Sequence, residues 1–165
     1  MASPAATETG GAAARVPTPA GFHHVSVPVK DLKQAQRFFI DVMGGEFIFD
    51  AGGFAEVRCG GMVIGFSQAD GGWTAPDAEF PHYAFLIDAE DMWPMKARLE
   101  ANGVPTHAIW TRNGYTGLMY FRDPSGNLFE LYCPRVRDED APKMVRRGQD
   151  GFAPPVGSLS YDWQR

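Results

Sequence analysis

Three residues of the sequence are suited to binding a divalent metal: His24, His82 and Glu130. Each lies in a segment that is expected to form a β-strand, and around His24 apolar and polar residues alternate, which is the pattern of a strand with one polar face. Two imidazole nitrogens and one carboxylate oxygen can hold iron, manganese, nickel or zinc on one side and leave positions open for a substrate or for oxygen. The sequence therefore predicts a 2-His-1-carboxylate metal centre.

The elements that carry these residues occur twice in the same order: a strand, a helix and three strands. The first copy is expected at residues 22–29, 32–42, 46–50, 54–58 and 62–67. The second copy is expected at residues 82–87, 88–102, 106–110, 118–122 and 128–133. Two βαβββ modules, each with one open sheet face, can close on each other within one chain or between two. We therefore expect an α+β fold whose two modules form a metal-binding cleft.

The repeat also divides the chain into segments. We expect a flexible N-terminal arm (1–20), one domain (21–134) made of module one (21–67), a linker (68–81) and module two (82–134), and a C-terminal tail (135–165). The tail is charged and then rich in glycine and proline, and we expect it to pack over the domain or its partner.

The composition limits the possible functions. The 165 residues carry a net charge of −5 with a pI near 5.3, so no broad cationic surface favours nucleic acid or an anionic membrane as a partner. Two cysteines do not form a disulfide framework, and no apolar run is long enough to span a membrane. We expect a cytoplasmic protein that acts on a small molecule.

Three strings, HHVSVPVKDLKQAQRFFIDVMGG, FPHYAFLID and YFRDPSGNLFELY, resemble the vicinal oxygen chelate superfamily. This superfamily includes glyoxalase I, bleomycin-resistance proteins, fosfomycin-resistance transferases and extradiol dioxygenases. The resemblance covers residues 21–134 and implies paired βαβββ modules around a metal, with His24 (not His23), His82 and Glu130 as its ligands. It also implies a homodimer in which each site takes one histidine from the partner.

Departures from two subfamilies narrow the choice. Glyoxalase I has a fourth protein ligand on its fourth strand, where this chain reads MVIGFSQ and offers only Gln68. Bleomycin-binding proteins lack the metal ligands that this chain keeps. The resemblance therefore disfavours a glyoxalase reaction and simple sequestration.

The fosfomycin transferases share the HYAF strand, the three ligands and a substrate-contacting tyrosine that Tyr120 matches. Their phosphonate-binding lysine and serines correspond here to Trp110, Gly114 and Leu118. Because these residues lack a cation and hydroxyl donors, the expected pocket is apolar and aromatic and suited to a ring-bearing substrate.

Residues 119–126 and Glu130 match the second half of the extradiol dioxygenase signature, whereas the histidine of its first half is missing at residues 111–113. That histidine is the general acid/base, so His107 or Tyr120 would have to replace it. We expect an iron(II)-dependent dioxygenase, an oxidoreductase that acts on a small aromatic or enolic substrate chelating the metal. The alternatives are a manganese-, nickel- or zinc-dependent transferase, lyase or isomerase, and a protein that binds a drug or metabolite.

The remaining candidates would contact the substrate. We expect Tyr120 to orient the reacting species as a catalytic residue, although a core tyrosine fits the same position. Ser26, Trp110, Arg112 and Tyr115 are expected to line the substrate pocket.

Overall fold

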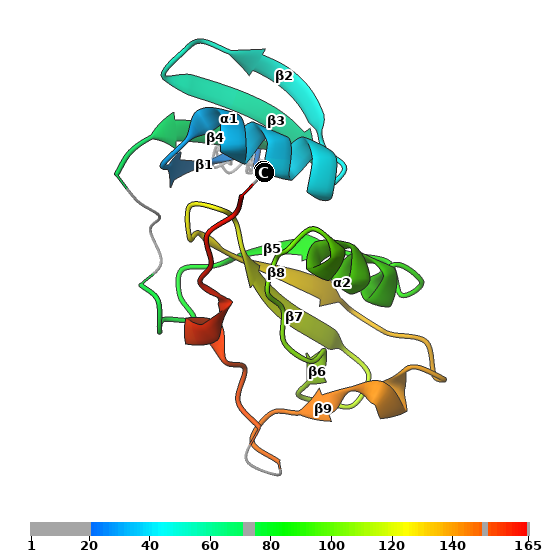
Figure 1. Cartoon of the computed structure of the whole chain (residues 1–165). Helices are drawn as coiled ribbons and strands as arrows, with labels where there is room; N and C mark the ends of the chain where they lie inside the picture. Colours follow the sequence, from blue (N-terminus) through cyan, green and yellow to red (C-terminus); the bar gives the residue numbers. More distant parts are fainter. Residues whose placement is uncertain (1–20, 71–74, 150–151, 165) are drawn as a thin grey trace, which may run out of the picture.

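The computed structural model describes residues 21–70, 75–149 and 152–164 (Figure 1), and the predicted N-terminal arm lies outside them. The first βαβββ module contains β1 (His24–Val29), α1 (Leu32–Arg37), the π-helical turn η1 (Phe38–Val42), β2 (Glu46–Asp50), β3 (Phe54–Cys59) and β4 (Met62–Gln68). The second contains β5 (Tyr83–Leu86), α2 (Met92–Ala101), β6 (Trp110–Thr111), β7 (Gly117–Arg122) and β8 (Leu128–Cys133). The following segment contains η2 (Ala141–Lys143), β9 (Val145–Arg146) and η3 (Val156–Leu159).

Each module forms its own sheet with the same arrangement. The strand order is β1-β4-β3-β2 in the first sheet and β5-β8-β7-β6-β9 in the second. In both, the first strand of the module lies at an edge and pairs in parallel with the last strand. The predicted α+β fold with two βαβββ modules is confirmed.

Helix α1 begins where the sequence predicts. The Asp31 side chain caps it by accepting a 2.9 Å hydrogen bond from the Gln34 backbone N–H. Leu32 and Ala35 face the core, and the chain turns away at Gly44, whose φ of +76° favours glycine.

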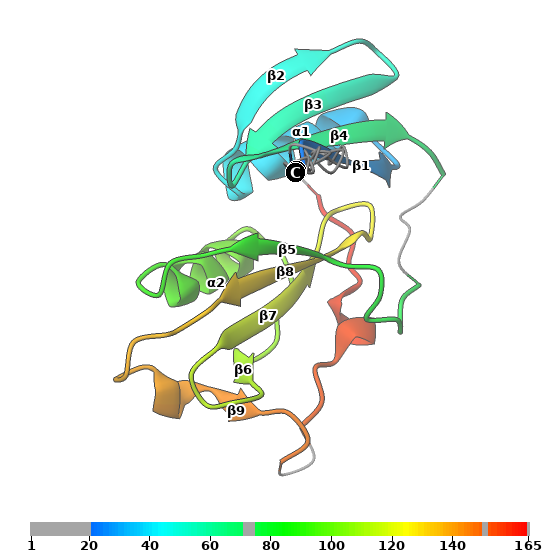
Figure 2. The same cartoon turned by 180° about the vertical axis from the view of Figure 1, so that it is seen from behind.

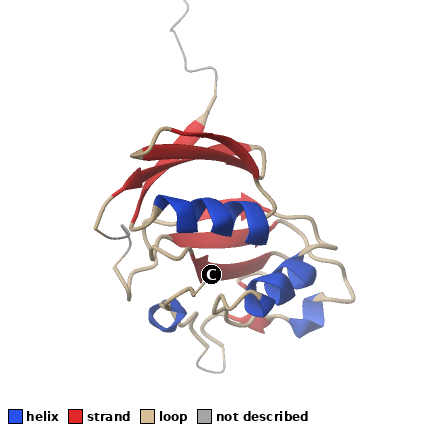
Figure 3. Ribbon diagram, turned by 45° about the horizontal axis from the view of Figure 1, so that its top comes forward, coloured by secondary structure: helices blue, strands red, loops and turns tan. Residues whose placement is uncertain are grey.

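Helix α1 lies between the two sheets, as Figures 2 and 3 show from two further directions. The Phe39 ring packs against Phe66 of the first sheet at 5.1 Å and against Phe129 of the second at 5.3 Å. Phe38 contacts Phe121 of the second sheet in the same way. Both sheets therefore share one core, and the other face of each sheet points outward.

Two predicted elements are shorter in the structure than expected. The strand expected at 106–110 is reduced to β6, because residues 104–109 run as a loop in which the His107 ring accepts a hydrogen bond from the Tyr120 backbone N–H. Helix α2 begins at Met92 rather than at residue 88, and Pro94 lies in its first turn, where proline is tolerated.

The C-terminal segment covers the outward face of the second sheet. Val156 and Leu159 of η3 pack in one cluster with Trp110 and Tyr120. The chain then passes between the modules, where Trp163 packs edge-on against Phe38. Within the described residues, none of the helices is long and apolar enough to cross a membrane.

Candidate metal centre

Glu130 lies on β8 and points to the outward face of the second sheet, because its neighbours Phe129 and Leu131 point into the core. Its cross-strand partners are Ala84 of β5 and Tyr120 of β7. The residue is only 5% exposed. Burial raises the pKa of this carboxyl above its ordinary value, while the nearby charges of His82 and Arg112 act in the opposite direction.

His82 precedes β5 and lies beside Glu130. Its Nδ1 is 2.7 Å from the backbone carbonyl oxygen of Glu79, so Nδ1 carries the hydrogen and donates it. In the neutral ring Nε2 then has only a lone pair, and it lies 3.4 Å from Glu130 Oε2. Two acceptors at this distance require a cation or a proton between them. A carbonyl that fixes the other ring nitrogen is the usual support of a metal-binding histidine, so this pair fits a divalent metal.

Tyr120 completes this part of the face. Its ring centre is 5.2 Å from that of His82, and the residue is 1% exposed. Burial, followed by the negative charge of Glu130, raises the pKa of the Tyr120 phenol to about 12. The hydroxyl therefore keeps its proton at neutral pH and is available as a hydrogen-bond donor beside His82 and Glu130.

His24 lies on the opposite side of the molecule. Val27 and Val29 of β1 point into the core, so His24 and Ser26 share the outward face of the first sheet. The helical layer separates this face from Glu130. Among the described residues, no three His, Cys, Asp or Glu side chains gather into a metal-binding group.

Ser26 belongs to the surroundings of His24. A Cβ atom at Gly65 would lie 2.8 Å from the Ser26 hydroxyl oxygen and 2.9 Å from the Phe54 ring. The glycine thus lets serine and ring lie close together on this face. Within one chain, Ser26 does not share the outward face that carries Glu130.

The other predicted pocket residues lie on or next to the Glu130 face. Trp110 is fully buried, and its ring centre is 6.0 Å from that of Tyr120. The exposed Arg112 places its guanidinium 5.3 Å from the centre of the Trp110 ring. Tyr115 is 49% exposed in the loop before β7, and its backbone N–H is held by the Asn113 side chain.

The geometry leaves His107 without a free ring nitrogen. Nδ1 donates to the Ala108 carbonyl at 2.8 Å, and Nε2 accepts from the Tyr120 backbone N–H at 3.0 Å. Burial lowers the pKa of the ring below its ordinary value. His107 therefore supports β7 and is not positioned as a general acid/base.

Two residues of this region are absent from the sequence-based prediction. Glu79 fixes His82 through its backbone, and its carboxylate forms a two-pronged ion pair with Arg147. The Arg147 guanidinium lies 5.3 Å from the centre of the Trp110 ring. The position of Glu79 three residues before a candidate ligand was a usable signal, whereas nothing in the tail sequence marks Arg147.

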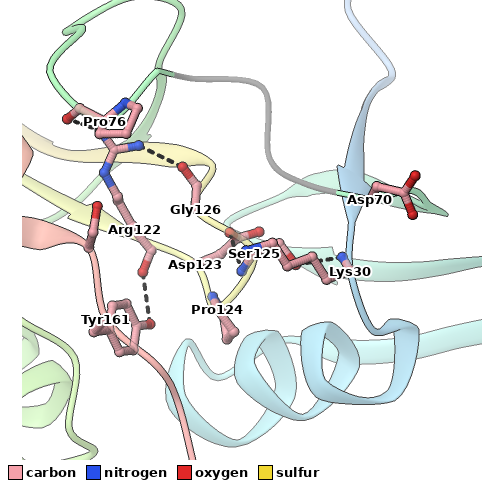
Figure 4. A pocket seen from close by; sticks show the side chains of 10 residues that line it. Lys30, Asp70, Pro76, Arg122, Asp123, Pro124, Ser125, Gly126 and Tyr161 are labelled. Atoms are coloured by element: carbon pink, nitrogen blue, oxygen red, sulfur yellow. Dashed lines mark hydrogen bonds between the residues drawn. The ribbon is translucent and has the colours of Figure 1, made fainter.

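The DPSGN motif after β7 has a structural role. Asp123 Oδ1 accepts hydrogen bonds from the backbone N–H groups of Ser125 and Asn127. The Ser125 hydroxyl accepts one from the Lys30 backbone N–H at 2.9 Å (Figure 4). Burial raises the pKa of Asp123 to about 6. The turn joins the modules beside a polar pocket of about 310 Å³ whose lining includes Arg122.

Comparison with known proteins identifies relatives of this site. Glutathione transferase FosA of Serratia marcescens is 30% identical over 113 residues, which are 67% of this chain and 78% of that protein. The fosfomycin resistance protein FosX of Listeria monocytogenes, in complex with Mn(II) and sulfate, is 25% identical and superimposes with a TM-score of 0.63 over 72% of this chain and 94% of its own. A variant of that protein in complex with Mn(II) and 1S,2S-dihydroxypropylphosphonic acid is 26% identical, with a TM-score of 0.62 over 76% and 98% of the two chains.

These relatives correct the expected function. The prediction of an iron(II) dioxygenase, and with it of an oxidoreductase, is wrong, because the relatives are a transferase and fosfomycin resistance proteins, and the metal in the related structures is manganese. The missing first half of the dioxygenase signature agrees with this correction. The family model described as Glyoxalase/Bleomycin resistance protein/Dioxygenase superfamily matches residues 21–131. The chain therefore belongs to the glyoxalase/bleomycin resistance protein/dioxygenase superfamily, as its sequence motifs predict.

Proposed function

We propose that the protein is a divalent-metal enzyme of the fosfomycin-resistance type, with manganese as the favoured metal and a Lewis-acid rather than an oxygen-activating reaction. The observation that carries the proposal is the approach of His82 Nε2 to Glu130 Oε2 at 3.4 Å, with the proton of the histidine held on the other nitrogen. The bound Mn(II) of the related FosX structures supports the same metal for this chain.

Each residue of the centre has a distinct task. His82 and Glu130 hold the metal, and the Glu79 carbonyl fixes the orientation of the His82 ring. When bound, the metal supplies a Lewis acid that polarises a substrate oxygen. Tyr120 donates a hydrogen bond to a substrate oxygen, which orients it for attack by a nucleophile.

The third ligand, His24, comes in this proposal from a second copy of the chain. In one chain His24 and Glu130 lie on outward faces that point away from each other, so a shared site requires a partner. An apolar groove of about 390 Å³ runs between β1, β4 and the edge strand β5. Phe22 and Leu86 line it and are 78% and 72% exposed, which is apolar surface suited to an interface.

Mixing two inactive variants tests the shared site. His24→Ala and Glu130→Ala homodimers should each bind Mn²⁺ weakly, as measured by electron paramagnetic resonance of free Mn²⁺. After unfolding and refolding together, random pairing makes half of the dimers mixed, and each mixed dimer has one intact site, so about a quarter of the sites should recover. Without any recovery, His24 and Glu130 would not belong to one site. A mixture of His24→Ala with His23→Ala serves as the control. His23→Ala keeps all three proposed ligands, so half of the sites are intact both before and after refolding, and Mn²⁺ binding should not change.

The substrate is tested in the same Mn²⁺-loaded protein. Fosfomycin with glutathione, fosfomycin alone and aryl analogues of the phosphonate should be followed by ³¹P nuclear magnetic resonance. Turnover with glutathione identifies a transferase, and turnover without it identifies addition of water or an isomerisation. Oxygen consumption with catechols, in place of any of these reactions, would refute the Lewis-acid proposal.

A further inference from the structure

Two guanidinium groups flank Trp110 on the face that carries Glu130. Arg112 follows β6 and Arg147 follows β9, and each places its guanidinium carbon 5.3 Å from the centre of the indole ring. Arg147 is ion-paired with Glu79 through two hydrogen bonds, which leaves further N–H groups on its guanidinium. Arg112 is exposed, and among the residues that the structure describes its guanidinium has no hydrogen bond or ion pair.

The indole itself has an unused donor. Trp110 is fully buried, yet within the described part of the chain its Nε1–H has no hydrogen-bond partner. Burying an N–H without an acceptor costs free energy, and structural donors of this kind are rare. An oxygen atom of a ligand would satisfy it once a covering side chain moves aside.

The charges of this face favour an anion. Without a metal, the carboxylates of Glu79 and Glu130 balance the guanidiniums of Arg112 and Arg147. A divalent cation at His82 and Glu130 makes the face net positive, in a chain whose total charge is −5. The Tyr120 ring lies between the two ends of the face, 5.2 Å from the His82 ring and 6.0 Å from the Trp110 ring.

We propose that Arg112 and Trp110 bind an anionic group of the substrate, a phosphonate or a carboxylate, and that Arg147 adds positive charge beside the Trp110 ring. The Tyr120 ring separates this subsite from the proposed metal. The metal at His82 and Glu130 rests on the proposed function, whereas anion binding by Arg112 and Trp110 does not. The subsite supplies the charge that the sequence lacks at Trp110, Gly114 and Leu118. Its Arg147 lies in the tail, beyond the residues 21–131 that the family model matches.

Calorimetric titration of phenylphosphonate, benzoate and neutral benzyl alcohol tests the subsite in both Mn²⁺-loaded and metal-free protein. The two anions should bind more tightly than the alcohol. Arg112→Gln should weaken the anions about tenfold and leave the alcohol unchanged, since a charge-assisted hydrogen bond is lost. Arg135→Gln, which removes an exposed arginine outside this face, should change neither.

Trp110→Phe tests the indole N–H. The substitution removes the unpartnered donor together with part of the indole ring, so the affinity for the anions should fall while that for benzyl alcohol changes less. The proposal is overturned if Arg112→Gln binds the anions as wild type does, or if a folded Trp110→Phe protein binds them as tightly as wild type does. Anion binding that depends on Arg112 in a protein without Mn²⁺ affinity would instead refute only the proposed metal function.

Discussion

His107 shows how a residue that looks catalytic in the sequence serves the fold. The imidazole takes the place of a strand neighbour for β7, because its Nε2 accepts the Tyr120 N–H that a longer β6 would otherwise have bonded. Sequence alternation predicted a strand at 106–110 and could not reveal this substitution of a side chain for a backbone acceptor. The same hydrogen bond positions Tyr120, so the histidine acts on the proposed site only through the backbone of that residue.

Stability should depend on pH through His107. Burial, the largest cause, lowers its folded-state pKa below 6.5, and the nearby Lys96 acts in the same direction, while the hydrogen bond to the Ala108 carbonyl and the charge of Glu79 oppose the shift. The unfolded chain therefore binds more protons as the pH falls through about 6.5, and the free energy of unfolding should decrease there. His107→Gln should destabilise the protein at pH 7 by about 1–3 kcal/mol, because a buried group loses its partner.

The measurement is urea unfolding at pH 7 and pH 5. The loss of stability between the two values should be smaller in His107→Gln than in the wild type, whereas His23→Gln, at an exposed position, should retain the wild-type dependence. An equal loss in His107→Gln and the wild type would mean that His107 is not the group responsible.

At the scale of elements, the repeated βαβββ order was predictable because each element has its own local signal. Asp31 and Gly44 bound the first helical segment, and paired glycines separate the strands of module one. The position of the tail was not predictable, because Val156, Leu159 and Trp163 have neither helical nor strand spacing and become buried only through contacts with distant segments. The candidate ligands lie on or next to strands with such local signals and could be found from the sequence. The ion pair between Arg147 and Glu79 could not, because Arg147 lies in the tail and is distant from Glu79 in the sequence.

The turn between β7 and β8 fastens module two to the end of β1. The Asn127 side-chain amide donates to the Pro28 carbonyl and to Asp123 Oδ2, both at 2.8 Å, and the residue is fully buried. Asn127→Ala should therefore lower the free energy of unfolding by about 2–3 kcal/mol, because it leaves buried acceptors without donors. Gln68→Ala removes an exposed amide near the same strand, 3.5 Å from the Lys30 carbonyl, and should change stability by less than about 0.5 kcal/mol. Urea unfolding of the two variants at pH 7 compares them, and similar effects would argue against the turn as the link between modules.

For the whole molecule, the arrangement of layers explains why one chain does not complete the proposed metal centre. A helical layer shared by both sheets gives one well-packed core, and it forces the two outward faces apart. The tail then covers Trp110 and Tyr120 on one outward face, while His24 remains exposed on the other. If the site is shared as proposed, folding occurs within a chain and completion of the site between chains.

Leu86→Asp should separate these two events. Leu86 is 72% exposed at the end of β5, so a carboxylate there leaves the core intact but places a charge in the apolar groove. Sedimentation should change from dimer to monomer, urea unfolding should keep the cooperativity of a single folded chain, and Mn²⁺ affinity should fall with dimerisation because the histidine of the partner is lost. Phe47→Asp is the matched control. Phe47 is 55% exposed on β2, which is the edge strand of the first sheet far from β1 and from the groove. A monomeric Leu86→Asp protein with wild-type Mn²⁺ affinity would show that the metal centre forms within one chain.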